Sequence, residues 1–218
     1  MRIIKRKKGK RYYFYLQHSF KKNNKTMTKE LYLGKEIPKD IDEFRKRLEN
    51  ESKKDLYLKL ENIKENFQKE WARTPKSAKE KEKENIAIAF TYNTNAIEGS
   101  TITLPETFNI IKDRVSPNKP LNDVRETESH YKLFLEMLDK KERLDENLLL
   151  RWHDKLFNET KKDIAGKFRE YLVRIGNHIA PDWQDVENLI NKLISFMNRS
   201  NLNPVELAAI SHYRFEWI

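Results

Sequence analysis

The chain has 218 residues, of which 38% are hydrophobic, 36% are charged and 11% are aromatic, and it contains no cysteine. The size and the aromatic content favour one folded domain with a small appendage over a disordered chain, and the lack of cysteine excludes disulfides and thiolate metal sites. The apolar runs are too short to cross a bilayer and the N-terminus lacks a signal peptide, so we expect a cytoplasmic protein without a membrane partner.

The excess of positive charge is concentrated at the N-terminus. The formal net charge is +10, and residues 1–30 hold 11 Lys or Arg residues against a single acid, Glu30. The remaining residues contain equal numbers of basic and acidic side chains. The basic character therefore belongs to an N-terminal arm rather than to the main domain.

Residues 1–37 are predicted to form a small β-meander. Apolar side chains alternate along residues 11–20, where one face would hold Tyr12, Phe14, Leu16 and Phe20. A turn at residues 21–25 suits asparagine, which tolerates a positive φ, and a second strand would run over residues 26–33 to Gly34. Ile3 and Ile4 are expected to add a third strand through a turn at Gly9.

After Pro38 the apolar residues recur every three or four positions, which predicts one long connecting helix over residues 38–75. Pro75 ends this helix because it disfavours the helical conformation of Thr74. The next helix is expected from near Ser77 to Glu98, with Gly99 as its C-terminal stop. Further helices are predicted near residues 104–114, 123–139, 145–157, 184–199 and 204–218.

Local sequence signals support these helix starts and predict one hairpin. Thr103 and Glu106 have the spacing of a capping box, and Asp145 and Asn203 are expected to be N-caps. Between the helices at 145–157 and 184–199, residues 167–179 alternate in polarity around a Gly176-Asn177 turn, which predicts a short β-hairpin.

The end of the second helix carries the first motif. Thr94 and Glu98 are four residues apart and so share one helix face. Glu98 precedes Gly99 at a helix end, where a carboxylate is unfavourable against the helix dipole. By itself this pattern also fits an ordinary solvated helix end. The string N-T-N-A-I-E-G-S over residues 93–100, however, resembles the inhibitory motif S/T-x-x-x-E-G/N of Fic proteins.

A second string resembles the turn that precedes the target-docking flap of Fic proteins. Gly166 and Arg169 fit the family's G-x-x-R turn, and the flap itself would comprise Val173, Arg174, Ile175 and Gly176. In that family the flap pairs with a segment of the target protein through backbone hydrogen bonds. The alternative interpretation is a surface hairpin that has no partner.

The C-terminal segment, residues 204–218, resembles the helix that delivers the active-site loop in Fic proteins. The family's catalytic motif, H-P-F-x-D/E-G-N-G-R, would follow Ile218 and does not occur among the 218 residues. His212 lies about one and a half helical turns before Ile218, and we expect it to be packed or to cap the helix rather than to replace the catalytic histidine. We therefore expect neither a catalytic residue nor a metal ligand within this chain.

The resemblance implies that residues 76–218 form a mainly α, Fic-type helical bundle with a short β-hairpin flap. It implies transfer of AMP from ATP, with Mg²⁺ on the phosphates, to a Ser, Thr or Tyr hydroxyl of a target protein. Glu98 would inhibit this reaction at the ATP site by pairing with the arginine of the catalytic motif, which displaces the γ-phosphate. We expect the 218 residues alone to bind neither ATP nor Mg²⁺ and to be inactive.

A different class of function is a binding module without catalysis. The basic and aromatic arm, residues 1–33, could hold nucleic acid or a protein, since aromatic residues 12–15 follow Lys10 and Arg11. The opposing interpretation is a solvated arm whose aromatic side chains pack on the domain. A second copy of the chain, in a homodimer, is a further candidate partner.

Overall fold

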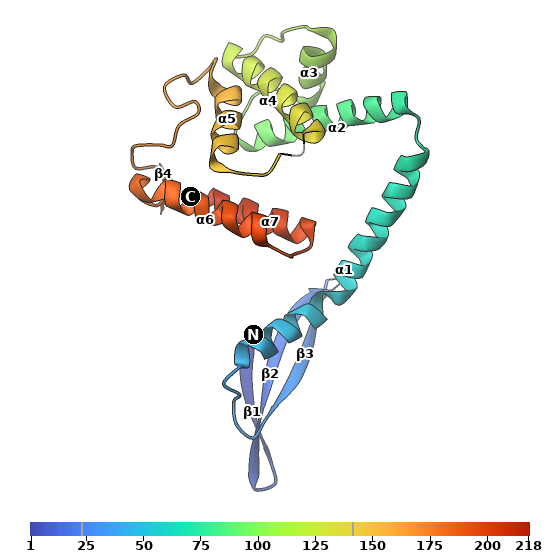
Figure 1. Cartoon of the computed structure of the whole chain (residues 1–218), viewed down its shortest axis with the longest axis vertical. Helices are drawn as coiled ribbons and strands as arrows, with labels where there is room; N and C mark the ends of the chain where they lie inside the picture. Colours follow the sequence, from blue (N-terminus) through green and yellow to red (C-terminus); the bar gives the residue numbers. More distant parts are fainter. Residues whose placement is uncertain (23, 141) are drawn as a thin grey trace. The chain divides into compact units, whose positions relative to one another are not determined.

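The computed structural model describes residues 1–22, 24–140 and 142–218, without the side chains of Lys22 and His178. These residues form two compact units, Met1–Arg73 and Thr74–Ile218, which are considered separately (Figure 1). The described part of the chain contains a three-stranded sheet, seven α-helices and a two-stranded hairpin, which confirms the predicted mainly helical fold with an N-terminal meander. None of the helices in these ranges has both the length and the apolar character that a bilayer crossing requires.

The first unit begins with an antiparallel sheet in the order β1-β2-β3. Its strands are β1 (Arg2–Lys8), β2 (Arg11–Lys22) and β3 (Lys25–Gly34). Gly9 turns the chain between β1 and β2 with a φ of +64°, as the sequence predicts. Lys22 pairs with Lys25, so the second turn is shorter than the predicted 21–25. Asn24 of that turn has a φ of +60°, whereas Asn23 lies outside the described residues.

One face of the sheet packs against the first part of α1 (Ile41–Arg73). Leu16, Leu33 and Leu48 are buried there, with Phe14, Leu31, Ile41 and Phe44 around them. The predicted inward face of β2 is thus confirmed for Phe14 and Leu16, but Tyr12 is 48% exposed near the end of the sheet. The predicted stripe of α1 forms a core only in its first turns. Farther along, its members Leu56, Ile63 and Phe67 are more than half exposed.

The second unit contains six helices and the hairpin. Their bounds are α2 (Lys76–Ile97), α3 (Leu104–Phe108), α4 (Leu121–Asp139), α5 (Glu146–Phe157), β4 (Arg174–Ile175), β5 (His178–Ile179), α6 (Trp183–Arg199) and α7 (Pro204–Glu216). The predicted helix at residues 104–114 changes after α3 into a single π-helical turn, η1 (Asn109–Asp113). Arg114 ends this turn with a φ of +58°, which no sequence pattern indicated.

The predicted caps fix three helix starts. Thr103 and Glu106 form a complete capping box in front of α3. Asp145 accepts the Leu148 N–H at 2.7 Å, and Asn203 accepts the Val205 N–H at 3.0 Å. Each side chain satisfies a backbone donor that the helix itself leaves open, a contribution of about 1 kcal/mol per cap.

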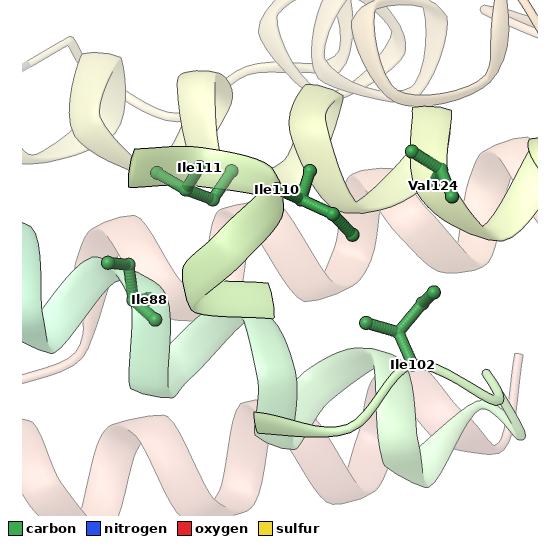
Figure 2. Packing of buried hydrophobic residues seen from close by; sticks show 5 residues of the cluster. All are labelled: Ile88, Ile102, Ile110, Ile111 and Val124. Carbon is green, nitrogen blue, oxygen red and sulfur yellow. The ribbon is translucent and has the colours of Figure 1, made fainter. Parts of the chain in front are cut away.

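Two apolar clusters hold the second unit together. The first joins α2, η1, α4 and the segment before α3, and consists of Ile88, Ile102, Ile110, Ile111 and Val124 (Figure 2). The second gathers around α6 and consists of Val186, Ile190 and Ile194, with Leu144, Leu149, Phe168 and Ile218 packed against them. Complete burial of each such side chain stabilises the fold by roughly 1.5–3 kcal/mol. The first cluster positions the end of α2, and the second positions the end of α7.

Candidate functional site

The end of α2 places a carboxylate in solvent. The Glu98 N–H donates to the Thr94 carbonyl at 3.3 Å, which completes the last helical turn. Gly99 then leaves the helix with a φ of +85°, and the Ser100 N–H donates to the Asn95 carbonyl at 2.9 Å. Thr94 is half-buried, whereas Glu98 is exposed at the edge of the same helix face. Gly99 ends the helix because this backbone conformation is disfavoured for residues with a Cβ.

The segment after Glu98 is anchored to the start of α4. Thr101 donates twice to Asp123 Oδ2, from its backbone N–H at 3.0 Å and from its hydroxyl at 2.9 Å. The next residue, Ile102, is 4% exposed and belongs to the first apolar cluster. Within four residues, Glu98 is therefore followed by a polar anchor and by a buried side chain. Both limit the movement of the backbone after Glu98.

Polar contacts inside the unit also join α2 to α4. The hydroxyl of Thr91 shares a hydrogen bond with His130 Nδ1 at 2.9 Å, and Asn95 Nδ2 donates to the Thr127 hydroxyl at 3.2 Å. Both threonines are completely buried. None of these four residues was predicted to belong to the site. A polar spacing of i, i+4 and i+7 could have pointed to Thr91 and Asn95, because it places both residues and Glu98 on one side of α2.

The histidine of this pairing favours its neutral form. Burial lowers the pKa of His130, because the charged imidazolium is disfavoured away from water. Its ring lies 5.8 Å from the ring of Phe90, which in turn stacks on Phe134 at 4.3 Å between centroids. Aromatic packing and a buried hydrogen bond thus fix the register between α2 and α4.

The Glu98 carboxylate has no hydrogen bond or ion pair with any residue in the described ranges. A rigid helix end with an open carboxylate can pair with a cation or repel an anion that approaches it. The alternative of a solvated helix end is compatible with the exposure of Glu98 and with the anchors on both sides of it.

A second set of candidate residues lies between α5 and α6. Gly166 has a φ of +69°, and its N–H donates to His153 Nδ1 at 3.1 Å. A Cβ at this position would lie 3.1 Å from the Asp154 Cβ, so the glycine is needed both for its conformation and for its close approach to α5. Burial lowers the pKa of His153, which favours the neutral imidazole, and the bond from the Gly166 N–H selects the tautomer with its proton on Nε2.

Arg169 connects three segments of the backbone. Its Nη1 donates to the Tyr171 carbonyl at 2.9 Å, and its Nη2 donates to the Pro181 carbonyl at 2.6 Å and to the Ile218 main-chain oxygen at 3.0 Å. Tyr171 and Pro181 lie on opposite sides of the hairpin. The planar guanidinium therefore closes the base of the hairpin segment and ties it to the residues after α7.

The hairpin itself projects apolar side chains into solvent. The Ala180 N–H donates to the Val173 carbonyl at 3.0 Å, and Arg174 and Ile175 pair with Ile179 and His178. Gly176 forms the turn with a φ of +59°. Leu172 and Ile175 are 65% and 71% exposed. A two-stranded hairpin leaves one edge of each strand unpaired, so a further strand can add to it.

The two sets of residues remain separate. Glu98 lies in the α2–α4 part of the unit, whereas Arg169 and the hairpin lie in the α5–α7 part, and within the described ranges no hydrogen bond or ion pair connects Glu98 to the hairpin. His212 is not packed, which was one of the two placements expected for it: its side chain is 75% exposed and lies 3.8 Å from Glu216. It therefore lies on the solvent side of α7.

No magnesium site can be assigned to these residues. Within residues 1–22, 24–140 and 142–218, no three His, Asp or Glu side chains are grouped so that they could hold a metal ion. Several carboxylates of the second unit are instead paired with lysines. Glu136, for example, bonds to Lys140 and Lys155, which lower the pKa of its carboxyl to about 2.

Comparison with known proteins relates part of the chain to a protein family. Residues 143–218, which span α5 to α7 with Gly166, Arg169 and the hairpin, match the Fic/DOC family. The protein adenylyltransferase Fic of Nematostella vectensis is 27% identical over 135 residues, which cover 58% of this chain and 32% of that protein. The protein of the same name from Drosophila erecta is 28% identical over 130 residues, covering 56% of this chain and 26% of the relative.

Solved structures show the same fold. A Fic domain containing signaling protein from Bacteroides thetaiotaomicron superposes with a TM-score of 0.59 and 26% identity, over 72% of this chain and 65% of that one. Fic-1 from C. elegans superposes with a TM-score of 0.62 and 20% identity, over 77% and 51% of the two chains. The chain thus has a Fic-like fold and a segment that matches the Fic/DOC family, with distant homology to Fic protein adenylyltransferases. It spans between about a quarter and a third of the length of these curated relatives.

Proposed function

We propose that residues 74–218 serve a protein adenylyltransferase activity, in which AMP passes from ATP to a Ser, Thr or Tyr hydroxyl of a target protein, and that Glu98 restrains this activity. The observation that carries the proposal is the open Glu98 carboxylate on a helix end anchored on both sides. The match of residues 143–218 to the Fic/DOC family supports the reaction class.

In this reaction the hydroxyl oxygen forms a bond to the α-phosphorus, the bond from that phosphorus to the bridging oxygen breaks, and pyrophosphate leaves. The hydroxyl proton passes to a general base. The magnesium ion that accompanies ATP neutralises phosphate charge when bound, but neither the base nor a metal ligand is assigned among the described residues. The roles proposed here for this chain are restraint by Glu98 and docking by the hairpin.

Restraint follows from the charge and the rigidity of the α2 end. A carboxylate beside a triphosphate raises the energy of the bound nucleotide and competes for the cations that the phosphates require. The effect requires that the helix end brings the carboxylate close to the nucleotide. The Thr101–Asp123 bonds and the Thr91 and Asn95 contacts to α4 hold the backbone around Glu98 in place, while its exposed side chain can turn toward a cation.

Docking follows from the exposed hairpin at residues 173–176. A target segment could add to its unpaired edge through backbone hydrogen bonds, while Leu172 and Ile175 contact apolar target side chains. Arg169 would keep the hairpin in register with the end of α7, since it bonds to the backbone on both sides of the hairpin and to Ile218.

The first test is the encoding gene, read beyond the codon for Ile218 in all three frames for H-P-F-x-D/E-G-N-G-R. Protein that contains this motif is then incubated with ATP labelled at the α-phosphate and with a cell lysate. We expect transfer of label to protein, and no transfer by residues 1–218 alone. A gene without the motif, or a motif-bearing protein that transfers no label, would contradict the proposal.

A further inference from the structure

The side of the sheet opposite α1 carries a cluster of tyrosines. Because side chains alternate along a strand, Leu16 of β2 points to the α1 side and its neighbour Tyr15 points to the opposite, open side. The ring of Tyr32 lies 5.4 Å from that of Tyr15 and 6.1 Å from that of Tyr13, measured between centroids. Tyr32 is 53% exposed. The open face therefore presents the exposed ring of Tyr32 beside the half-buried rings of Tyr13 and Tyr15.

Charged side chains hold this aromatic cluster in place. The Arg6 guanidinium lies 4.9 Å from the centre of the Tyr15 ring. It also donates two hydrogen bonds to the carboxylate of Glu30, at 2.8 and 2.6 Å. Gln17 donates to the same carboxylate at 2.8 Å and accepts from Arg2 at 2.6 Å. Tyr15 is thus contacted by both Arg6 and Tyr32, which reduces the entropy it would lose on binding a ligand.

The single acid of this region offsets only one of its basic side chains. Arg6 lowers the pKa of the Glu30 carboxyl through their hydrogen bonds, so the carboxylate is committed to that pair. Lys8, Arg11 and Lys21 have no ion pair within the described residues and lie on the same side of the sheet as Tyr13 and Tyr15, because Lys8 pairs with Arg11 and the odd-numbered residues of β2 share that side. Lys8 and Arg11 are opposite each other beside the Gly9 turn. The face consequently joins an aromatic platform to unpaired positive charge.

We propose that this open face, defined by Tyr13, Tyr15, Tyr32, Lys8 and Arg11, binds single-stranded nucleic acid. Exposed rings stack on bases, and every base offers a flat surface for this contact. Lysine and arginine at the end of the sheet meet the phosphates. A single strand fits better than a duplex, because a duplex hides the flat surfaces of its bases between neighbouring pairs. This binding goes beyond the proposed AMP transfer and is independent of it.

The test uses the 218-residue chain and a fluorescein-labelled, mixed-sequence DNA of about 20 nucleotides, its RNA equivalent and the matching DNA duplex. Fluorescence anisotropy is measured from about 50 to about 300 mM salt. We expect both single strands to bind more tightly than the duplex, with an affinity that falls as salt rises.

Tyr32→Thr should weaken binding roughly five-fold or more, because one base no longer has a ring to stack on. Changing Lys8 and Arg11 to Gln should make the salt dependence shallower, by about 0.7 in the log–log slope for each phosphate that is no longer neutralised.

Matched controls separate these effects from general charge and exposure. Tyr171 is 54% exposed in the second unit, so Tyr171→Thr removes a comparable ring and should leave binding unchanged. Lys162→Gln and Lys59→Gln each remove one exposed charge elsewhere and should leave the salt slope unchanged. Tyr32→Phe retains the ring and should bind within about two-fold of the unaltered chain. This variant also provides a folded comparison if Tyr32→Thr melts early.

Several results would overturn the assignment. One is equal or tighter binding of the duplex, and another is the absence of binding to any oligonucleotide at the lowest salt concentration. A third is affinity that is unaffected by Tyr32→Thr while the variant melts like the unaltered chain. Binding of polyglutamate or heparin that matches the single strands would assign the face to acidic polymers in general, and so would also overturn it.

Discussion

The Arg169 side chain donates a hydrogen bond to the main-chain oxygen of Ile218 at 3.0 Å, across 49 residues of sequence. The same guanidinium holds the carbonyls of Tyr171 and Pro181. Because one planar group makes all three bonds, the hairpin and the segment after α7 cannot separate without breaking part of this set. The candidate docking hairpin is therefore coupled mechanically to the helix that resembles the carrier of the active-site loop.

Arg169→Lys is expected to loosen this link. A lysine retains the charge but cannot direct donors at three carbonyls from one plane, and hydrogen bonds to charged groups are worth about 1.5–3 kcal/mol each before allowance for solvent. Because the site is partly exposed, we expect the free energy of unfolding to fall by about 1–3 kcal/mol in total. Urea unfolding followed by circular dichroism measures this change. Hydrogen exchange should also accelerate at residues 171–181, whereas Arg174→Lys, a change at an exposed arginine of the hairpin, should alter neither quantity.

Gly166→Ala should destabilise the second unit by about 2–5 kcal/mol. The new Cβ would lie 3.1 Å from the Asp154 Cβ, and the residue would also have to keep a φ of +69°. A left-handed conformation costs roughly 1–2 kcal/mol and overpacking typically about 1–3 kcal/mol. Gly176→Ala is the matched control: its φ is +59°, but no atom lies within 4 Å of the added Cβ. Equal reductions of stability in the two variants would show that the contact with Asp154 has no energetic effect.

Stability should decline as the pH falls below about 6.5, the ordinary pKa of histidine. Burial lowers the pKa of both His130 and His153, so in that range the unfolded chain binds protons that the folded chain refuses. The free energy of unfolding then decreases with falling pH until the folded-state pKa values of the two histidines are reached. Above the ordinary pKa of histidine, the titration of His130 and His153 no longer changes the free energy of unfolding. Thermal melting between about pH 5 and pH 8 measures the effect. His130→Gln removes one titrating group and should reduce the decline, and an unchanged pH profile in this variant would assign the decline to other groups.

The sequence predicted most of the fold because its elements are marked locally. The caps at Thr103, Asp145 and Asn203 depend on side chains within three residues of each helix start. The change from period-two to helical spacing after Pro38 likewise separates the meander from the helices. Where tertiary contacts decide the structure, sequence reasoning was less successful. The π-helical turn at Asn109–Asp113 places Ile110 and Ile111 together in the apolar cluster, and no local pattern indicates it.

The candidate site was predictable only in part for the same reason. Thr94, Glu98 and Gly99 lie within six residues and carry a recognisable string, so the sequence could name them as candidates. The contacts that hold the α2 end come from another helix: His130 pairs with Thr91, and Thr127 pairs with Asn95, at separations of 39 and 32 residues. Likewise, the expected packing of His212 failed because its surroundings depend on which side of α7 meets α6, which its own helix does not determine.

Glu98 is predicted to inhibit the protein that carries the H-P-F-x-D/E-G-N-G-R motif. In that protein, Glu98→Gly should increase AMP transfer, including transfer to the protein itself. Removal of a Glu–Arg contact that competes with the γ-phosphate could relieve roughly 2–4 kcal/mol, a rate change of tens to hundreds of fold. Folding should change little, because a glycine at a helix end costs about 1 kcal/mol or less.

Glu98→Gln should also activate, since it removes the charge. Glu82→Gln, a matched change at an exposed position of α2, should not. Initial rates of labelling from α-labelled ATP, with melting curves for each variant, distinguish these outcomes. If the Glu98→Gly protein melts normally and labels no faster than the unaltered protein, Glu98 is a solvated helix end and does not regulate the reaction.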